Sequence, residues 1–219
     1  MILCPNCGVL PKEAVQLYRD DLKKQNIRIS PILPTCARCN SEVQIPYSDT
    51  SGHIIVLNGT CGSGKTSVAE YFQDNGYFAI DGDCAIQSLR HKKGAKQYEW
   101  NELINEIASE IGLLTYFTKD IVLSHVILPE DVERYISVFA SYGLQYKLVV
   151  LRPDYQAAVE RCQNRTAHEN VTPEIWIKHF YDILIFDETG VDIIDNTNQS
   201  IEETATQIDN LPWRMVASV

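Results

Sequence analysis

The chain has 219 residues, of which 45% are hydrophobic and 22% are charged, a composition ordinary for a soluble globular protein. This length allows one sizeable domain and a small one, and no apolar run approaches the roughly 18 residues of a membrane-spanning helix. The net charge of −10 disfavours a general nucleic-acid binder, because such binding comes mostly from cations that neutralise phosphates.

The charge is distributed unevenly along the chain. Residues 1–48 carry six Lys/Arg and four Asp/Glu, whereas the remainder carries 13 and 25. The acidic main part therefore favours a small molecule, held in a local pocket, as the binding partner. A local basic groove could still bind the end of a nucleic acid. Met1 is not followed by the basic region and long apolar run of a secretory signal, so we expect a cytoplasmic protein.

Four of the seven cysteines form two Cys-x-x-Cys pairs near the N-terminus. Each pair can form a knuckle, a tight turn that directs two thiolates at one metal, and two knuckles supply the closed sulfur set of a structural Zn²⁺. The expected zinc ligands are Cys4, Cys7, Cys36 and Cys39. Redox-active or free thiols are the alternative. The segment resembles zinc-ribbon and rubredoxin-like modules, and it is too short to build much core, so metal binding would supply folding energy.

We expect this zinc module to span residues 1–48 and the main domain to span 49–219, joined by the polar turn-formers of 46–52. Within the module, the hydrophobic spacing predicts a helix over 11–25 and short strands at 27–29 and 42–45.

Residues 59–66 have the pattern G-x-x-x-x-G-K-[ST] of a Walker A phosphate-binding loop. They follow an apolar run predicted as a strand over 53–58 and precede a helix predicted over 64–75, which is the context that a true match requires. The glycines let successive N–H groups point at one anion, and the helix start adds the positive end of its dipole. Lys65 would reach the β- and γ-phosphates of ATP, and Thr66 would offer its hydroxyl to Mg²⁺. The residues expected to bind the nucleotide here are Gly59, Thr60, Cys61, Gly62, Ser63, Gly64, Lys65, Thr66 and Ser67.

A second predicted strand, over 77–80, runs directly into Asp81-Gly82-Asp83. Carboxylates at the carboxyl end of a parallel strand lie where α/β sheets bind their ligands. In a phosphoryl-transfer site such an Asp can accept the proton of the acceptor hydroxyl or order the waters on Mg²⁺. The alternative is an acidic turn in which an Asp caps the next helix.

Strand, Walker loop, helix, strand and Asp-Gly-Asp in this order resemble the small-molecule kinases of the P-loop class. Adenylylsulfate kinases carry a comparable Asp-Gly-Asp and continue with Asn and Arg, where this chain has Cys84-Ala85-Ile86. Chloramphenicol phosphotransferase-like and gluconate kinase-like proteins carry an Asp at this place, and the chain also resembles shikimate kinase-like proteins. The resemblance covers roughly residues 53–210. It implies an α/β P-loop NTPase fold, a three-layer sandwich whose five-stranded parallel sheet has the order 2-3-1-4-5.

The segment 84–116 is mostly helical by its spacing and contains a basic cluster at 90–96. In the kinases that the chain resembles, this segment forms the acceptor pocket, so Arg90 is a candidate to hold an anionic or nucleotide acceptor. A solvated helix end and loop is the alternative.

A third apolar strand is predicted over 120–128. Many P-loop proteins place a Walker B Asp near the end of this strand, whereas this chain has Ser124-His125. Asp81 and Asp83 are therefore the expected Mg²⁺-linked carboxylates. His125 could contact the acceptor together with Asp83, or it could be a hydrogen-bonded structural residue.

A helix predicted from Pro129 to Gly143 and a strand over 146–151 lead to a helix that carries Arg161 and Arg165. These two residues are spaced i,i+4 and share one helical face. The resemblance implies a lid over the triphosphate, in which guanidinium groups neutralise charge on the transferred phosphoryl group. A surface helix with ion pairs to Glu160 is the alternative.

The last part of the chain predicts a helix from Thr172-Pro173 onward, a fifth strand over 191–195 and a helix over 201–210. We expect the apolar stripe of the first of these helices to be core, namely Ile175, Trp176, Phe180, Ile183 and Leu184. The resemblance implies that the loop after the fifth strand, with Asn196 and Asn198, lies beside the base of the nucleotide.

The sequence thus favours an ATP-dependent phosphotransferase that acts on a hydroxyl of a small molecule, such as a nucleoside or nucleotide, a sugar or an antibiotic. Its catalytic residues would be Lys65, Asp81, Asp83, Arg161 and Arg165. A polynucleotide 5′-hydroxyl kinase and an ATP-gated interaction module without acceptor chemistry are the alternatives. The expected cofactors are ATP, Mg²⁺ and structural Zn²⁺. No membrane partner is expected, and the oligomeric state is open, a homodimer included.

Overall fold

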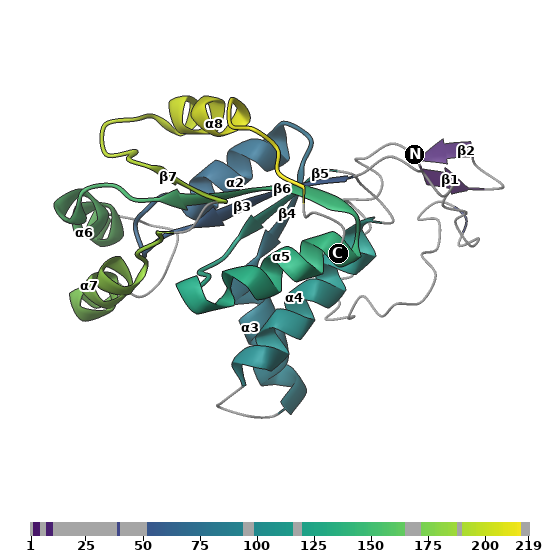
Figure 1. The fold of residues 1–219 in the computed structure, drawn as a ribbon, viewed down its shortest axis with the longest axis horizontal. Helices are drawn as coiled ribbons and strands as arrows, with labels where there is room; N and C mark the ends of the chain where they lie inside the picture. Colours follow the sequence, from purple (N-terminus) through teal and green to yellow (C-terminus); the bar gives the residue numbers. More distant parts are fainter. Residues whose placement is uncertain are drawn as a thin grey trace.

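The computed structural model describes residues 2–4, 8–10, 39, 52–93, 99–115, 120–164, 172–187 and 190–215. Five strands form one parallel sheet in the order β4-β5-β3-β6-β7, which confirms the expected order 2-3-1-4-5 (Figure 1). The strands are β3 (Gly52–Asn58), β4 (Phe78–Asp81), β5 (Asp120–Ser124), β6 (Leu144–Leu151) and β7 (Val191–Ile194). The helices are α2 (Lys65–Asp74), α3 (Gly82–Lys93), α4 (Trp100–Thr115), the 3₁₀ turn η1 (Pro129–Asp131), α5 (Val132–Ser141), α6 (Tyr155–Asn164), α7 (Glu174–Ile183) and α8 (Ile201–Asp209).

The central strand β3 is buried on both faces because helices cover both sides of the sheet. Ile54 and Val56 pack into a core formed with side chains of α3, α4 and α5. Ile55 and Leu57, which point to the other face, pack with side chains of α2 and α8. Side chains alternate between the two faces of a strand, so a strand covered on both sides has a continuous apolar sequence. Together with the strand order and the Walker A sequence after β3, this arrangement makes the fold a P-loop NTPase sandwich.

Strand β5 ends at Ser124, four residues earlier than the sequence predicts. His125 still donates its N–H to the carbonyl of Leu57 on β3, at 3.1 Å. Two residues later, the side chain of Asn58 pairs with both the N–H and the carbonyl of Ile127. A side chain thus replaces the strand ladder, and the backbone leaves the sheet while its buried polar groups keep partners.

The apolar stripe of α7 is not core as a whole, which corrects the expectation from helical spacing. Ile175 and Trp176 are 75% and 53% exposed, and Ile183 is 36% exposed. Ile177 is buried in a small cluster with residues of α6, and Leu184 is buried in the larger core. Helical spacing shows that a face is apolar but does not show which part of that face a neighbouring element covers.

Helix α8 is fixed at both ends, and this fixes the loop that precedes it. At its start Ser200 and Glu203 form a capping box, in which each side chain accepts a hydrogen bond from the other residue's backbone N–H. At its end the buried Lys147 on β6 donates to the carbonyls of Ile208 and Asp209, at 3.1 and 2.8 Å. A cation at a helix carboxyl end interacts favourably with the helix dipole. The loop between β7 and α8 is therefore held at a defined place.

The N-terminal stretch contributes an antiparallel pair of strands, β1 (Ile2–Cys4) and β2 (Gly8–Leu10). Cys7 and Cys36, the helix and two strands expected within the module, and the boundary at residue 48 lie outside the described residues. The zinc module therefore stays a prediction. Among the residues that the structure describes, no three His, Cys, Asp or Glu side chains gather as a metal site. Within the same residues, no helix has the length and apolar character needed to cross a membrane.

Replacing Asn58 by Asp is predicted to lower the free energy of unfolding by about 2 to 4 kcal/mol. The Asn58 amide nitrogen donates to the carbonyl of Ile127 at 2.8 Å, and its oxygen accepts from Gly59 and Ile127 N–H groups. A carboxylate lacks the donor and places a charge in a fully buried position. Urea unfolding measures the change. Asn75→Asp is the matched control, because the exposed Asn75 amide also donates to a backbone carbonyl. Equal losses in the two variants would contradict the prediction.

Candidate active site

The Walker loop has the geometry of an anion-binding cradle. Gly59, Gly62 and Gly64 have φ values of 136°, 77° and 97°, which side chains rarely adopt. A Cβ on Gly59 would lie 2.4 Å from the carbonyl oxygen of Leu151, so the loop also needs the absence of a side chain there. Helix α2 starts at Lys65 with no side-chain cap and no acidic residue in its first turn. Its first N–H groups are therefore available to an anion.

Three side chains hold this loop in place from different directions. Asn58 accepts a hydrogen bond from the N–H of Gly59 at 2.7 Å. The hydroxyl of Thr60, which is buried, donates to the carbonyl of Ile177 on α7 at 3.0 Å. On the far side, the amide of Asn196 donates to the carbonyl of Ser63 at 2.9 Å. The loop is thus built by the surrounding fold and does not depend on a ligand for its shape.

The ammonium group of Lys65 lies within the loop and close to the expected acidic residues. Its Nζ donates to the carbonyls of Gly59 and Thr60, at 2.7 and 2.8 Å. Burial lowers the pKa of Lys65 below its ordinary value, and the charges of Cys61, Asp83 and Asp81 oppose that shift. Both carboxylates of Asp-Gly-Asp therefore act electrostatically on the Walker lysine. Their expected roles in a shared phosphate site stay a prediction.

The two carboxylates have different surroundings. Asp81 ends β4, and its Oδ1 accepts the N–H of Asp83 at 2.9 Å, so it caps the start of α3. This is the capping role that the sequence left as an alternative, and it uses one of the two carboxylate oxygens. Asp83 is exposed in the first turn of α3. Residues 81–83 thus present one anchored and one solvent-facing carboxylate at the carboxyl edge of the sheet.

His125 occupies the place next to Asp81 where many P-loop proteins have an acid. Ser124 pairs with Asp81 across strands β5 and β4, and the following His125 is only 5% exposed. A Cβ on Gly82 would lie 2.0 Å from its Nδ1, so the glycine of Asp-Gly-Asp provides the space for the imidazole. No sequence pattern links Gly82 with His125, because they are 43 positions apart in the chain.

The environment of His125 keeps its imidazole neutral. Burial, with a further contribution from the charge of Lys65, lowers the pKa of His125 to about 4. Its ring lies against Trp100 and Tyr135, with centroids 6.3 and 5.9 Å away. Among the described residues, neither its Nε2 nor the hydroxyl of Tyr135 has a hydrogen-bond partner. His125 is thus an uncharged polar group beside the Walker lysine and cannot replace a carboxylate as a metal ligand of negative charge.

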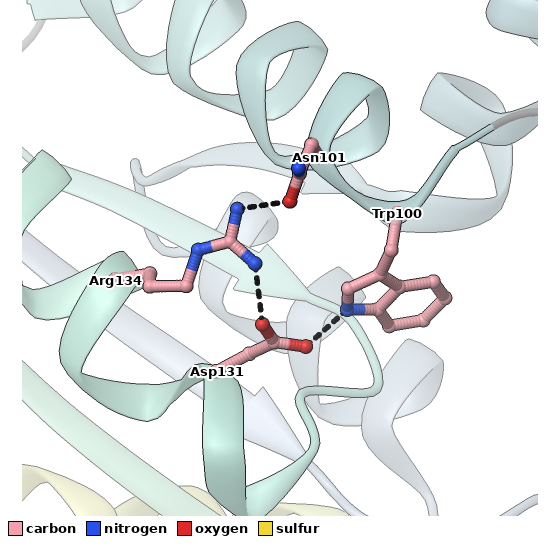
Figure 2. Close-up of polar contacts among 4 residues, drawn as sticks. All are labelled: Trp100, Asn101, Asp131 and Arg134. Carbon is pink, nitrogen blue, oxygen red and sulfur yellow. Dashed lines mark hydrogen bonds and ion pairs between the residues drawn. The ribbon is translucent and has the colours of Figure 1, made fainter.

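A polar network holds the start of α4 against the start of α5 (Figure 2). The carboxylate of Asp131, which is 4% exposed, accepts hydrogen bonds from the indole N–H of Trp100 and from Arg134, the latter at 2.8 Å. Arg134 also donates to the side chain of Asn101. Because Trp100 lies against His125, this network connects the helical arm of α3 and α4 to the carboxyl edge of β5. Sequence spacing gave no signal for it.

Arg161 is engaged with the loop after β7. Its Nη2 donates to the carbonyls of Asn196 and Thr197, at 2.8 and 2.9 Å. Arg165 and the lid turn lie outside the described residues, so their role stays a prediction. The other expected site residues are placed as follows: Thr66 exposed in the first turn of α2, Arg90 exposed on α3, Asn196 buried beside the Walker loop and Asn198 exposed.

Comparison with known proteins places the chain among P-loop proteins. The model of a family described as AAA domain matches residues 54–182, which is more than half of the chain. No curated protein matches it in sequence.

Three solved structures illustrate the likeness of the fold. A gluconokinase from Sinorhizobium meliloti 1021 is 22% identical, with a TM-score of 0.53 over 72% of this chain and 89% of that chain. A tunicamycin resistance protein of Deinococcus radiodurans is 18% identical, with a TM-score of 0.55 over 74% and 98%. A chain of the Pnkp1/Rnl/Hen1 RNA repair complex is 15% identical, with a TM-score of 0.50 over 64% and 46%.

The low pKa of His125 predicts that the protein loses stability as the pH falls. An unfolded histidine has a pKa near 6.5, so between pH 6.5 and 4 the unfolded state binds a proton that the folded state does not. The stability linked to the neutral His125 is fully present above about pH 6.5. By pH 4 the free energy of unfolding has fallen by roughly 3 kcal/mol on account of this residue. Urea unfolding at pH 7 and at pH 4 measures the loss of unfolding free energy between the two pH values. This loss should be smaller by this amount in His125→Phe than in the wild type. His179→Phe, on the exposed face of α7, is the control and should follow the wild type. Parallel pH curves for wild type and His125→Phe would refute the prediction.

Proposed function

We propose that this chain, which belongs to the AAA domain family, is an ATP-dependent phosphotransferase that moves the γ-phosphoryl group to a hydroxyl of a small molecule. The observation that carries the proposal is the meeting of two sets of groups at one edge of the sheet. The Walker loop after β3 offers amides and Lys65, and the turn after β4 offers Asp81 and Asp83. A hydrolytic motor needs only a water molecule beside the phosphate, whereas this edge adds a helical arm suited to hold a larger acceptor.

In the proposed reaction the acceptor oxygen attacks the γ-phosphorus, and the bond between that phosphorus and the β,γ-bridging oxygen breaks. ADP leaves with the bridging oxygen, and the acceptor hydroxyl loses its proton to a carboxylate. Asp83 is our choice for this base because it faces solvent, whereas Asp81 is anchored to the start of α3. Of the two carboxylates, Asp83 also has the larger influence on Lys65.

The residues present fit both ATP and Mg²⁺. The glycine-rich cradle and the uncapped start of α2 suit a triphosphate, and Lys65 can exchange its two carbonyl partners for phosphate oxygens. Thr66 is exposed in the first turn of α2, from where its hydroxyl can bind the metal. Asp81 can order water molecules around it. Bound Mg²⁺ would neutralise charge on the β- and γ-phosphates, and it usually keeps several waters.

The acceptor would lie between the carboxylates and the arm formed by α3 and α4. His125 presents no charge there, and the network around Asp131 fixes the start of α4 beside it. The similar gluconokinase and tunicamycin resistance structures support small molecules as the acceptor class. The similar chain of an RNA repair complex supports a nucleic acid end as the second class.

Lys65→Ala is predicted to abolish phosphoryl transfer while leaving the fold intact. Among the described residues the amine donates only to groups of its own loop, the carbonyls of Gly59 and Thr60 and the hydroxyl of Ser63, so its loss removes phosphate contacts and little packing. Transfer from γ-labelled ATP is measured against nucleosides, sugars, aminoglycosides, adenylylsulfate and a 5′-hydroxyl oligonucleotide. Lys178→Met changes an exposed lysine of α7. It is the control and should retain activity.

Phosphoryl transfer at the wild-type rate by Lys65→Ala would contradict the proposed phosphotransferase function. Labelling of the oligonucleotide alone, with binding that weakens steeply as salt rises, would establish the polynucleotide kinase instead. Slow ATP hydrolysis that no acceptor stimulates would favour the ATP-gated interaction module.

Asp131→Ala is predicted to raise the KM for the acceptor about tenfold and to leave the KM for ATP within twofold. The change removes the hydrogen bonds that Asp131 accepts from Trp100 and Arg134, and neither donor belongs to the phosphate loop. Steady-state kinetics with the best acceptor of the panel measures both constants. Glu133→Ala, an exposed carboxylate in the first turn of α5, is the matched control. A parallel rise in the KM for ATP would mean a general loss of structure and would contradict the prediction.

A further inference from the structure

The loop between β7 and α8 is bound to two other parts of the nucleotide site. The amide of Asn196 reaches the Walker loop, where it donates to the carbonyl of Ser63 at 2.9 Å. The hydroxyl of Thr197 accepts the N–H of Asp154, just before α6, at 2.7 Å. Arg161 on α6 donates to the carbonyls of both loop residues, at 2.8 and 2.9 Å. Movement of this loop therefore requires these contacts to break.

The sheet order indicates which end of a nucleotide meets this loop. Asp81 and His125 follow β4 and β5, on one side of the central strand β3, whereas the Asn196 loop follows β7 on the other side. Figure 1 shows the same separation, with α3 and α4 below the sheet and α6 and α7 together at its left. The transferred phosphoryl group must face the carboxylates. The nucleoside of a triphosphate held in the Walker loop therefore extends toward β7.

We propose that Arg161 is a positioning residue for the nucleoside side of this site: it holds the carbonyls of Asn196 and Thr197 and acts on ATP binding through that loop, without contacting the phosphates. This inference rests on the proposed function, and it assigns Arg161 a role different from the lid role expected from the sequence. Both hydrogens of Nη2 are directed at neighbouring carbonyls, a geometry that suits the planar guanidinium group.

The internal bonding of the loop supports this role. Asp195 accepts hydrogen bonds from the N–H and the hydroxyl of Thr197, at 2.9 and 2.5 Å. These bonds lower the pKa of the Asp195 carboxyl group, with a further contribution from Arg161. The loop is thus a small closed turn that carries negative charge on its exposed side and is held to α6 by a cation. Removal of the Arg161 or the Asp195 side chain would therefore loosen the same loop between β7 and α8.

The test compares the binding of ATP with that of inorganic triphosphate, which has no nucleoside. In Arg161→Met, the Kd for ATP should rise about tenfold, while the Kd for triphosphate and the kcat at saturating ATP stay within twofold of wild type. Arg161→Lys keeps a cation with donors and should recover part of the loss. Calorimetry measures both ligands, and Lys178→Met serves as the surface control. An equal weakening of ATP and triphosphate binding would show a phosphate contact and overturn the proposal.

A second variant keeps the test valid if Arg161→Met folds poorly. Asp195→Ala changes an exposed side chain of the same loop and should show the same pattern, weaker ATP binding with unchanged triphosphate binding. In the double variant the loss for ATP should be no greater than the larger single loss, because both changes act through one segment. Full additivity would overturn the proposal. A wild-type protein that binds neither ligand would refute the proposed function, and the role of Arg161 with it.

Discussion

The side chain of Asn58 joins the two strand ends on which the candidate site depends. Asn58 is the last residue of β3, and its amide bonds the first glycine of the Walker loop as well as both backbone groups of Ile127. Without these bonds, the segment after β5 would have unpaired polar groups inside the protein. The phosphate loop and the His125 segment are therefore held at a fixed separation. Under the proposed function, this fixed separation would lower the entropy that a ligand bound between them has to spend on ordering the site.

Much of the fold could be predicted because β3 and β6 are buried on both faces and therefore appear as continuous apolar runs. The Walker loop was equally predictable, since its chemistry needs glycines and a lysine at fixed spacing. The contacts of Arg161 and Trp100 were not, because they join residues more than 30 positions apart and leave no periodic signal. The exposed face of α7 escaped prediction because an apolar stripe looks the same whether or not a neighbour covers it.

The pair Gly82 and His125 explains how the site differs from P-loop proteins with an acid after the third strand. A glycine between two aspartates is needed because an imidazole fills the space of its missing side chain. Burial beside Lys65 then keeps that imidazole uncharged. The negative charge near the Walker lysine comes from the turn after β4 instead. These carboxylates lie on the same turn that begins α3, so under the proposed function acceptor binding and metal binding would share one structural element.

The two sides of the Walker loop are supported by separate networks. On the β5 side, Asp131 binds Trp100 and Arg134, and on the β7 side, Arg161 and Asn196 fix the loop before α8. No described residue belongs to both networks, and in the strand order the central strand β3 lies between the strands that they follow. Changes at sites without shared partners have nearly additive effects on the free energies of folding and binding. Under the proposed function, changes in the α3–α4 arm should therefore alter the acceptor while the nucleotide affinity, which the loop after β7 would set, stays the same.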